Sequence, residues 1–141
     1  MAYGNRKRAH APEGMMVDEM RILLVSPDLL STSRIAALAR PLPARVETLR
    51  SLDDEPREGP FDLILLDLQS LAGDAAVIVA RAVKLVEKQV ADAGHAPKLV
   101  AFGPHVQKER LADAVAAGAD AAVSRGELLG SFPGLVKRWM G

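Results

Sequence analysis

The chain has 141 residues, 18 basic and 18 acidic side chains, and no cysteine. The length favours a single domain, and the balanced charge gives no general attraction to nucleic acid or to an anionic membrane. The lack of cysteine excludes disulfides, thiolate metal sites and a cysteine nucleophile. No apolar run reaches the roughly 18 residues that a membrane span needs, and no apolar stretch follows the basic N-terminal residues as in a secretory signal. We therefore expect a cytoplasmic domain with no membrane insertion and no nucleic-acid partner.

The first part of the chain, residues 1–19, differs in composition from the rest. It is polar, punctuated by glycine and proline, and without periodicity, which predicts a disordered tail in front of a folded domain over residues 20–141. The tail contains the basic cluster Arg6-Lys7-Arg8. We interpret this cluster as solvated charge, with contact to an acidic partner as the alternative.

From residue 20 onward, strand signals and helix signals alternate. The expected strands are Arg21–Val25, Arg45–Leu49, Leu63–Leu66, Lys98–Phe102 and Ala121–Ser124, and the expected helices are Leu30–Ala39, a long one from Asp74 to about Asp92, Gln107–Ala117 and Phe132–Met140. The connection between the second and third strands, residues 51–60, reads SLDDEPREGP. Because it is charged and broken by Pro56, we expect the second helix to be short or missing.

The pattern of the strands indicates how they are assembled. The third and fourth strands are continuous apolar runs, LILL and KLVAF, as in strands that are buried on both faces of a parallel sheet. Alternating strands and helices with right-handed crossovers give a doubly wound α/β fold in three layers, and five strands favour the order 2-1-3-4-5. In that order several strand ends converge on one crevice, whose rim would consist of Ser26, Asp67, Gly103, His105 and Arg125.

The stretch AFGPHVQKERLADAVAAGADAAVSRGE, residues 101–127, resembles the receiver domain of two-component response regulators. The spacings from Gly103 to Gly118 and from Gly118 to Arg125 match the receiver positions of a strand-four hydroxyl, a helix-closing glycine and a strand-five lysine. The resemblance extends from about Met20 to Met140 and implies the flavodoxin-like fold.

In receivers, an aspartate accepts a phosphoryl group from a histidine kinase. An acid pair at the end of strand one holds the required Mg²⁺, and the hydroxyl and the lysine bind the phosphoryl oxygens. In this chain Asp67 takes the acceptor position, Ser26 and Pro27 fall on the acid pair, Gly103 falls on the hydroxyl and Arg125 on the lysine. The resemblance therefore implies that this chain has the receiver fold but lacks most of the side chains that bind Mg²⁺ and the phosphoryl group in receivers.

Without the acid pair, a single carboxylate would have to hold the metal, so we expect phosphorylation to be slow or absent. The sequence favours a degenerate receiver-like signalling module that acts by protein–protein interaction and is not an enzyme, with no catalytic residues, metal or cofactor. A sensor kinase or another signalling protein would be the partner. Two alternatives stay open. One is a phosphorylatable stand-alone response regulator with Asp67 as acceptor, and the other is a flavodoxin-like domain that binds a small ligand at the rim.

Further expectations concern single residues. Asp67 should form a structural ion pair with Arg125 across the strand ends. His105 should be an exposed loop histidine, residues 108–110 a solvated helix face, and Trp139 a cover for the sheet edge. The sequence contains no Walker loop, GxGxxG, HExxH or GxSxG motif.

Overall fold

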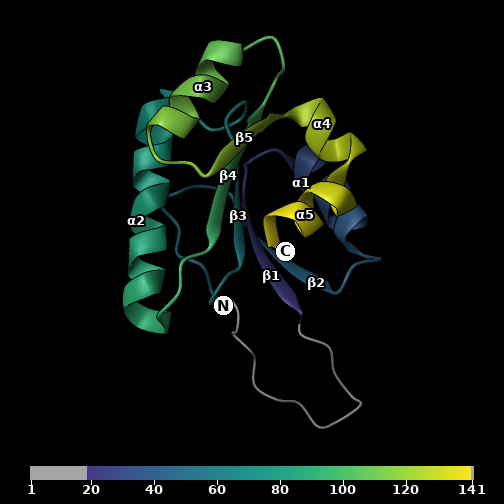
Figure 1. The fold of residues 1–141 in the computed structure, drawn as a ribbon, viewed down its shortest axis with the longest axis vertical. Coiled ribbons are helices and arrows are strands. Elements are labelled where there is room, and N and C mark those ends of the chain that lie inside the picture. The colour runs from purple at the N-terminus through teal and green to yellow at the C-terminus, as the bar shows by residue number, and fades with distance from the viewer. Residues whose placement is uncertain (1–18, 141) are drawn as a thin grey trace, which may run out of the picture.

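The computed structural model describes residues 19–140, which form a parallel sheet between two layers of helices (Figure 1). The strands are β1 (Met20–Val25), β2 (Ala44–Leu49), β3 (Leu63–Asp67), β4 (Lys98–Gly103) and β5 (Ala121–Ser124). All neighbouring strands are parallel and their order is β2-β1-β3-β4-β5. The predicted doubly wound α/β architecture is confirmed.

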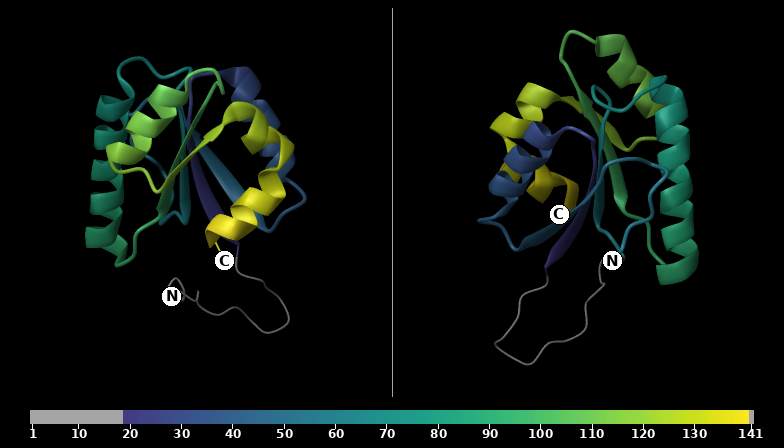
Figure 2. Two further views of the ribbon diagram at one scale, coloured as in Figure 1. Left: turned by 45° about the horizontal axis from the view of Figure 1, so that its top comes forward. Right: turned by 180° about the vertical axis from the view of Figure 1, so that it is seen from behind.

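The helices divide between the two faces of the sheet. They are α1 (Leu29–Ala39), α2 (Ala75–Ala93), α3 (Lys108–Ala116), α4 (Arg125–Gly130) and α5 (Phe132–Met140). As Figure 2 shows, α2 and α3 cover one face, and α1, α4 and α5 cover the other. The C-terminal α5 brings Trp139 against the core of its face, where it is half-buried.

Burial on both faces explains the continuous apolar runs. In β1, Leu23 and Val25 belong to the core under α2, while Ile22 and Leu24 belong to the core under α1 and α5. All five residues of β3 are buried. A strand between two helical layers cannot alternate apolar with polar side chains, because each of its faces lies against a core.

The connection between β2 and β3 contains no helix, as predicted from Pro56 and the charged residues around it. Two side chains hold it instead. The Glu47 carboxylate accepts backbone N–H groups of Arg57 at 2.7 Å and Glu58 at 3.0 Å. The Gln89 amide accepts from the backbone N–H of Phe61 and donates to its carbonyl, both at 2.7 Å. We call residues 50–62 the β2–β3 connection; it runs beside α2 on the face that α2 and α3 cover (Figure 2, right).

The short helix α4, which the sequence reasoning missed, follows β5 directly. The Ser124 hydroxyl oxygen accepts the backbone N–H of Glu127 at 3.0 Å. This Ser-x-x-Glu pattern is the signature of a capping box and was the signal available for the helix.

The predicted disordered tail lies outside the described residues, apart from Glu19. Among the helices that the structure describes, none combines the length and the apolar composition that crossing a bilayer requires.

Candidate functional site

Asp67 ends β3 at the carboxyl edge of the sheet, where the strand ends converge. Its side chain is completely buried. One carboxylate oxygen, Oδ2, accepts the hydroxyl of Ser26 at 2.7 Å. The other, Oδ1, accepts the backbone N–H groups of Gln69 at 3.1 Å and Ser70 at 3.2 Å, in the turn that follows the strand. Both oxygens of Asp67 are therefore occupied by donors of the protein itself.

Ser26 joins the ends of β1 and β3. It is as deeply buried as Asp67, and its hydroxyl both donates to Asp67 and accepts the backbone N–H of Asp28 at 3.1 Å. The next residue, Pro27, has no polar side-chain atom to offer. Ser26 is thus part of the hydrogen bonding that joins the two strand ends.

Asp28 caps α1 and is the ionic partner of Arg125. Its carboxylate accepts the Ser31 hydroxyl at 2.6 Å and the backbone N–H groups of Ser31 at 3.2 Å and Leu30 at 3.3 Å. Arg125 Nη2 lies 3.9 Å from Asp28 Oδ2. The Ser31 hydroxyl above all, then the two backbone N–H groups and the Arg125 charge, lower the pKa of Asp28.

The prediction of an ion pair between Asp67 and Arg125 is wrong. Among the described residues, the carboxylate within ion-pair distance of Arg125 is that of Asp28. The physical reason is local. Ser26 and the turn N–H groups satisfy Asp67, and Asp28, one residue beyond the acid-pair positions, presents a half-exposed carboxylate to the guanidinium.

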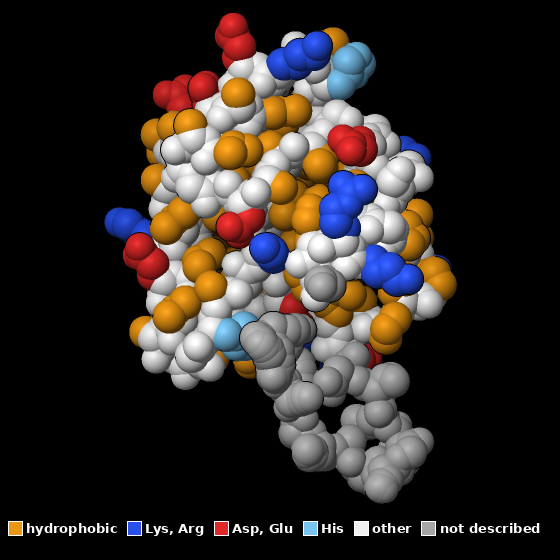
Figure 3. All heavy atoms as spheres, viewed as in Figure 1, with side chains coloured by type: hydrophobic (Ala, Val, Ile, Leu, Met, Phe, Trp, Pro, Cys, Tyr) orange, Lys and Arg blue, Asp and Glu red, His pale blue; other side chains and the backbone are white. Residues whose placement is uncertain are grey.

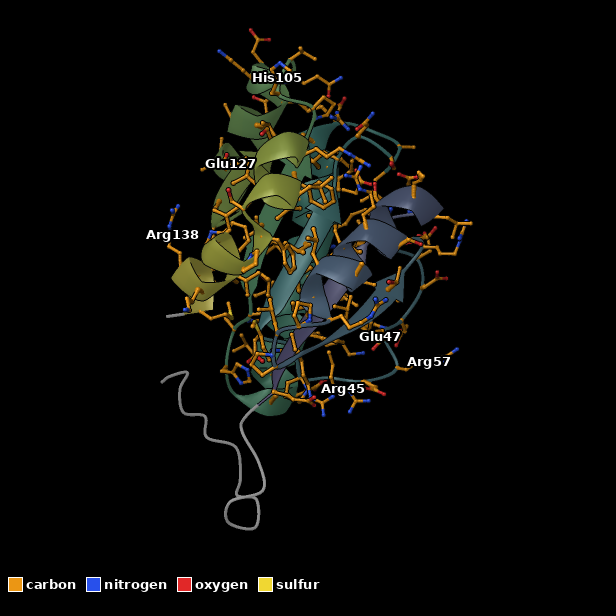
Figure 4. The ribbon with its side chains drawn as sticks, turned by 90° about the vertical axis from the view of Figure 1, so that its right-hand side faces the viewer. Arg45, Glu47, Arg57, His105, Glu127 and Arg138 are labelled. Carbon is orange, nitrogen blue, oxygen red and sulfur yellow. The ribbon has the colours of Figure 1, made fainter. Side chains whose placement is uncertain are left out.

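The other two rim residues lie in different environments. Gly103 ends β4 and is buried, and a β-carbon added to it would meet Leu68 and Leu111 at an ordinary 3.7 Å. A small side chain would therefore fit at this position. His105 is exposed in the loop after β4 and lies at the extreme end of the molecule (Figure 4), as expected of a loop histidine. The structure brings Ser26 and Asp67 together but does not place His105 with them.

Arg110 was not among the expected site residues, because residues 108–110 read as a solvated face. Its Nη2 donates to the carbonyl of Leu68 at 2.8 Å and to the carbonyl of Gly73 at 2.9 Å. Arg110 therefore fastens α3 to the turn that follows Asp67, and that part of the expectation is wrong. The sequence offers little signal for such a contact, since it depends on the path of a loop about forty residues earlier.

The surroundings of Asp67 bear on whether it could bind a metal ion. Mg²⁺ prefers several oxygen ligands in octahedral geometry. Here the buried Asp67 carboxylate already accepts three hydrogen bonds, from Ser26, Gln69 and Ser70. Within residues 19–140, no group of three or more histidine, aspartate or glutamate side chains is arranged to hold a metal ion.

Comparison with known proteins gives the same fold from an independent direction. No family model matches the sequence, and no curated protein matches it. Solved structures do match. A CheY-like receiver domain protein of Methanospirillum hungatei superposes with a TM-score of 0.68 at 18% identity, over 87% of this chain and 94% of that one.

Two further structures agree with this result. A chemotaxis response regulator of Vibrio cholerae gives a TM-score of 0.67 at 14% identity, over 86% of this chain and 99% of that one. The receiver domain of a Pseudomonas aeruginosa sensor histidine kinase, solved with a magnesium ion in its active-site cleft, gives 0.63 at 17% identity, over 88% of this chain and 99% of that one. The sheet order, the helical layers and these superpositions show that the chain has the fold of response-regulator receiver domains.

Proposed function

We propose that this chain is a degenerate receiver-like signalling module that acts by binding another protein and has no aspartyl-phosphate switch. One observation carries the proposal. The Asp67 carboxylate is completely buried and accepts hydrogen bonds from Ser26 and from two backbone N–H groups. A phosphoryl acceptor needs an accessible oxygen and a cation beside it, and Asp67 has instead become part of the support of the strand ends.

The residues around Asp67 support the same interpretation. Receivers hold Mg²⁺ with an acid pair, and the similar Pseudomonas aeruginosa domain was solved with that ion in its cleft. In this chain the pair is replaced by Ser26, whose hydroxyl is already used, and by Pro27. Gly103 offers no hydroxyl, and Arg125 is engaged with Asp28. Each missing group removes one contact to the metal or to the phosphoryl oxygens.

The surface near the crevice favours a protein partner. Leu29 and Leu30, in the first turn of α1, are 67% and 58% exposed, and Val106, in the loop after β4, is 75% exposed. All three follow strand ends and so lie at the carboxyl edge of the sheet. Figure 3 shows side chains of both charges with hydrophobic ones between them on the face it draws, which is unlike the basic surface that a polyanion attracts.

The phosphorylation half of the proposal is tested by adding beryllofluoride or acetyl phosphate with Mg²⁺ and following the amide NMR signals of the full chain. We expect the signals around Asp67 to stay in place. A saturable shift in the millimolar range, lost in Asp67→Asn, would overturn the proposal and establish the phosphorylatable response regulator.

A restored variant provides the control. Ser26→Asp, Pro27→Asp, Gly103→Thr and Arg125→Lys together return the acid pair, the hydroxyl and the lysine, and the 3.7 Å contacts at Gly103 leave room for the new side chain. We expect this variant to bind Mg²⁺ and to respond to beryllofluoride. Asp67→Asn in the same background should abolish the response.

The partner half is tested by a pull-down from native cells with the full chain as bait. Leu29→Ser with Leu30→Ser should reduce capture of a specific partner. The matched control is Val90→Ser, which alters an apolar residue, 42% exposed, in the last turn of α2, at the end of that helix opposite to the carboxyl edge. Equal capture by all three baits would show that the α1 surface is not the binding site.

A further inference from the structure

The β2–β3 connection leaves a hollow where receivers have a helix. The hollow has a volume of about 500 Å³ and lies between this connection and the second half of α2. Its floor is made of apolar side chains from the sheet, the connection and α2, namely Leu23, Leu52, Phe61, Ile64 and Leu85. Its size is within the range of ligand-binding pockets.

The rim of the hollow has an excess of negative charge. Its acidic residues are Asp53, Asp54, Glu55, Glu58 and Asp92, and its basic residues are Arg57 and Lys88. Three of the acids have ionic partners: Asp53 pairs with Arg81, Glu55 with Lys88, and Glu58 with Arg21. Within residues 19–140, Asp54 and Asp92 form no ion pair. The hollow therefore suits an occupant with apolar and cationic groups.

The chain itself supplies such a segment. Residues 1–18 contain the basic cluster Arg6-Lys7-Arg8 and, closer to the sheet, Met15 and Met16. They join β1 at the end where β1 contacts the rim: Arg21 Nη1 lies 3.2 Å from Glu58 Oε1, and the Arg21 backbone N–H donates to Asp62 at 2.8 Å. Arg45 and Arg57 lie toward this end of the molecule and His105 at the other (Figure 4).

The length of the segment is sufficient. An extended chain spans about 3.3–3.6 Å per residue, so the stretch from Arg8 to Glu19 reaches about 35 Å. That is longer than α2, whose 19 residues span about 28 Å at 1.5 Å per residue. The methionines, three and four residues before Glu19, would stay near the floor while the basic cluster extends to the rim.

We propose that residues 1–18 dock in this hollow of their own chain, with Met15 and Met16 over the apolar floor and Arg6-Lys7-Arg8 against Asp54 and Asp92. A tethered segment has an effective concentration in the millimolar range, so weak contacts are enough to occupy the site. This advantage favours the chain's own segment over a second copy or a separate basic protein. The proposal does not depend on the function proposed above.

The chain offers a clean test because it has no cysteine. Ala9→Cys in the full chain accepts a single nitroxide label beside the basic cluster. We expect a roughly twofold or greater loss of amide signal for residues 52–58 and 85–93 at low salt, because the tether keeps the segment docked most of the time. At about 1 M sodium chloride, where the Debye length is about 3 Å, the signals should return.

Charge reversal sharpens the test. Asp54→Lys with Asp92→Lys should abolish the selective loss at low salt, and so should Arg6→Ser with Lys7→Ser and Arg8→Ser, which leave the described domain unaltered. The matched control, Glu109→Lys with Glu127→Lys, makes the same change in net charge on α3 and α4 and should leave the loss intact. The proposal would be overturned if the full chain showed no signal loss, or if the loss fell on other residues. It would also be overturned if the loss persisted both in the Asp54→Lys, Asp92→Lys variant and in the Arg6→Ser, Lys7→Ser, Arg8→Ser variant.

A mixing experiment separates the possible occupants. Ala9→Cys chain that carries the nitroxide but no ¹⁵N is added to chain that is enriched in ¹⁵N and carries no nitroxide. Intrachain docking predicts no signal loss in the mixture. A loss at residues 52–58 and 85–93 in the mixture would show that a second copy supplies the segment, and the intrachain proposal would be wrong.

Discussion

At the carboxyl edge of the sheet, polar side chains are buried and bonded to one another, whereas along the β2–β3 connection they are exposed and paired across the surface. Ser26 and Asp67 are both completely buried and lie 2.7 Å apart. In the connection, Glu55 pairs with Lys88 at 3.8 Å, with their side chains 81% and 63% exposed. The two regions therefore satisfy their charged groups in physically different ways.

The difference shows two ways in which polar groups are satisfied within one fold. At the strand ends, the neutral hydroxyl of Ser26 donates to the Asp67 carboxylate, so the burial of Asp67 is compensated. In the connection, Glu47 and Gln89 hold a segment without a helix through hydrogen bonds to its backbone. The first arrangement gives both oxygens of Asp67 donors within the protein, and the second leaves a hollow beside α2.

The largest effect should come from the crevice. Ser26→Ala removes the buried donor to Asp67 and the acceptor for the Asp28 backbone N–H. We expect it to lower the free energy of unfolding by about 2–3 kcal/mol, measured by urea denaturation. The control is Ser33→Ala on the exposed side of α1, which should change stability by less than about 0.5 kcal/mol.

The same pair can be tested by a double-mutant cycle. Asp67→Asn removes the charge that the Ser26 hydroxyl stabilises, so Ser26→Ala should cost less in that background, with a coupling of about 1 kcal/mol. Additive effects would show that the two side chains do not support each other, and the main argument for a closed crevice would be lost.

A smaller effect is expected for Arg110, which links α3 to the turn after Asp67. Arg110→Ala removes one charged group that donates to two carbonyls, those of Leu68 and Gly73. We expect a cost of about 1–2 kcal/mol. Lys108→Ala, two residues earlier on an exposed position of the same helix, should be nearly neutral. Equal effects of the two substitutions would contradict this role of Arg110 and would support the original interpretation of residues 108–110 as a solvated face.

Asp28 should make the free energy of unfolding depend on pH, in a direction that follows from the shift of its pKa. The Ser31 hydroxyl, the backbone N–H groups and Arg125 lower the pKa of Asp28 in the folded state. A carboxylate with a lowered folded pKa contributes stability that is fully present above its unfolded pKa and is lost as the pH falls through the folded pKa. The contribution of Asp28 should therefore disappear in the acid range below its ordinary aspartate value, about 3.9.

The contributions to this lowering can be ranked by NMR titration of the Asp28 carboxyl carbon. Ser31→Ala should raise the pKa of Asp28 more than Arg125→Ala does, because the hydroxyl lies at 2.6 Å and the guanidinium at 3.9 Å. A larger rise with Arg125→Ala would show that the ion pair, rather than the helix cap, sets the charge of Asp28.

The contrast between the two regions also explains what the sequence could predict. Continuous apolar runs in β3 and β4 predict strands buried on both faces, and the sheet order then brings Ser26 and Asp67 to one edge. Pro56 and its charged neighbours predict the missing helix. Backbone patterns of this kind depend on short-range chemistry and on the rules of parallel sheets, so a single sequence contains them.

Side-chain partners were harder to predict. Arg125 follows the strand end that was expected, but the choice between Asp28 and Asp67 depends on which carboxylate is already satisfied. Arg110 depends on the path of the turn that contains Leu68. These contacts are set by differences of a few ångströms between loops, and neither composition nor periodicity records such differences.

The smallest effects should lie in the β2–β3 connection. Arg81 pairs with Asp53, and Lys88 with Glu55, on exposed positions where water and salt screen the charges. Arg81→Ala and Lys88→Ala should each change the free energy of unfolding by no more than about 0.5 kcal/mol. The Arg81–Asp53 coupling should be equally small and should vanish at about 1 M salt. A coupling above about 1.5 kcal/mol would contradict this, because exposed pairs typically contribute less than 1 kcal/mol. The connection would then be held as firmly as the crevice, and the hollow beside it would have a rigid wall.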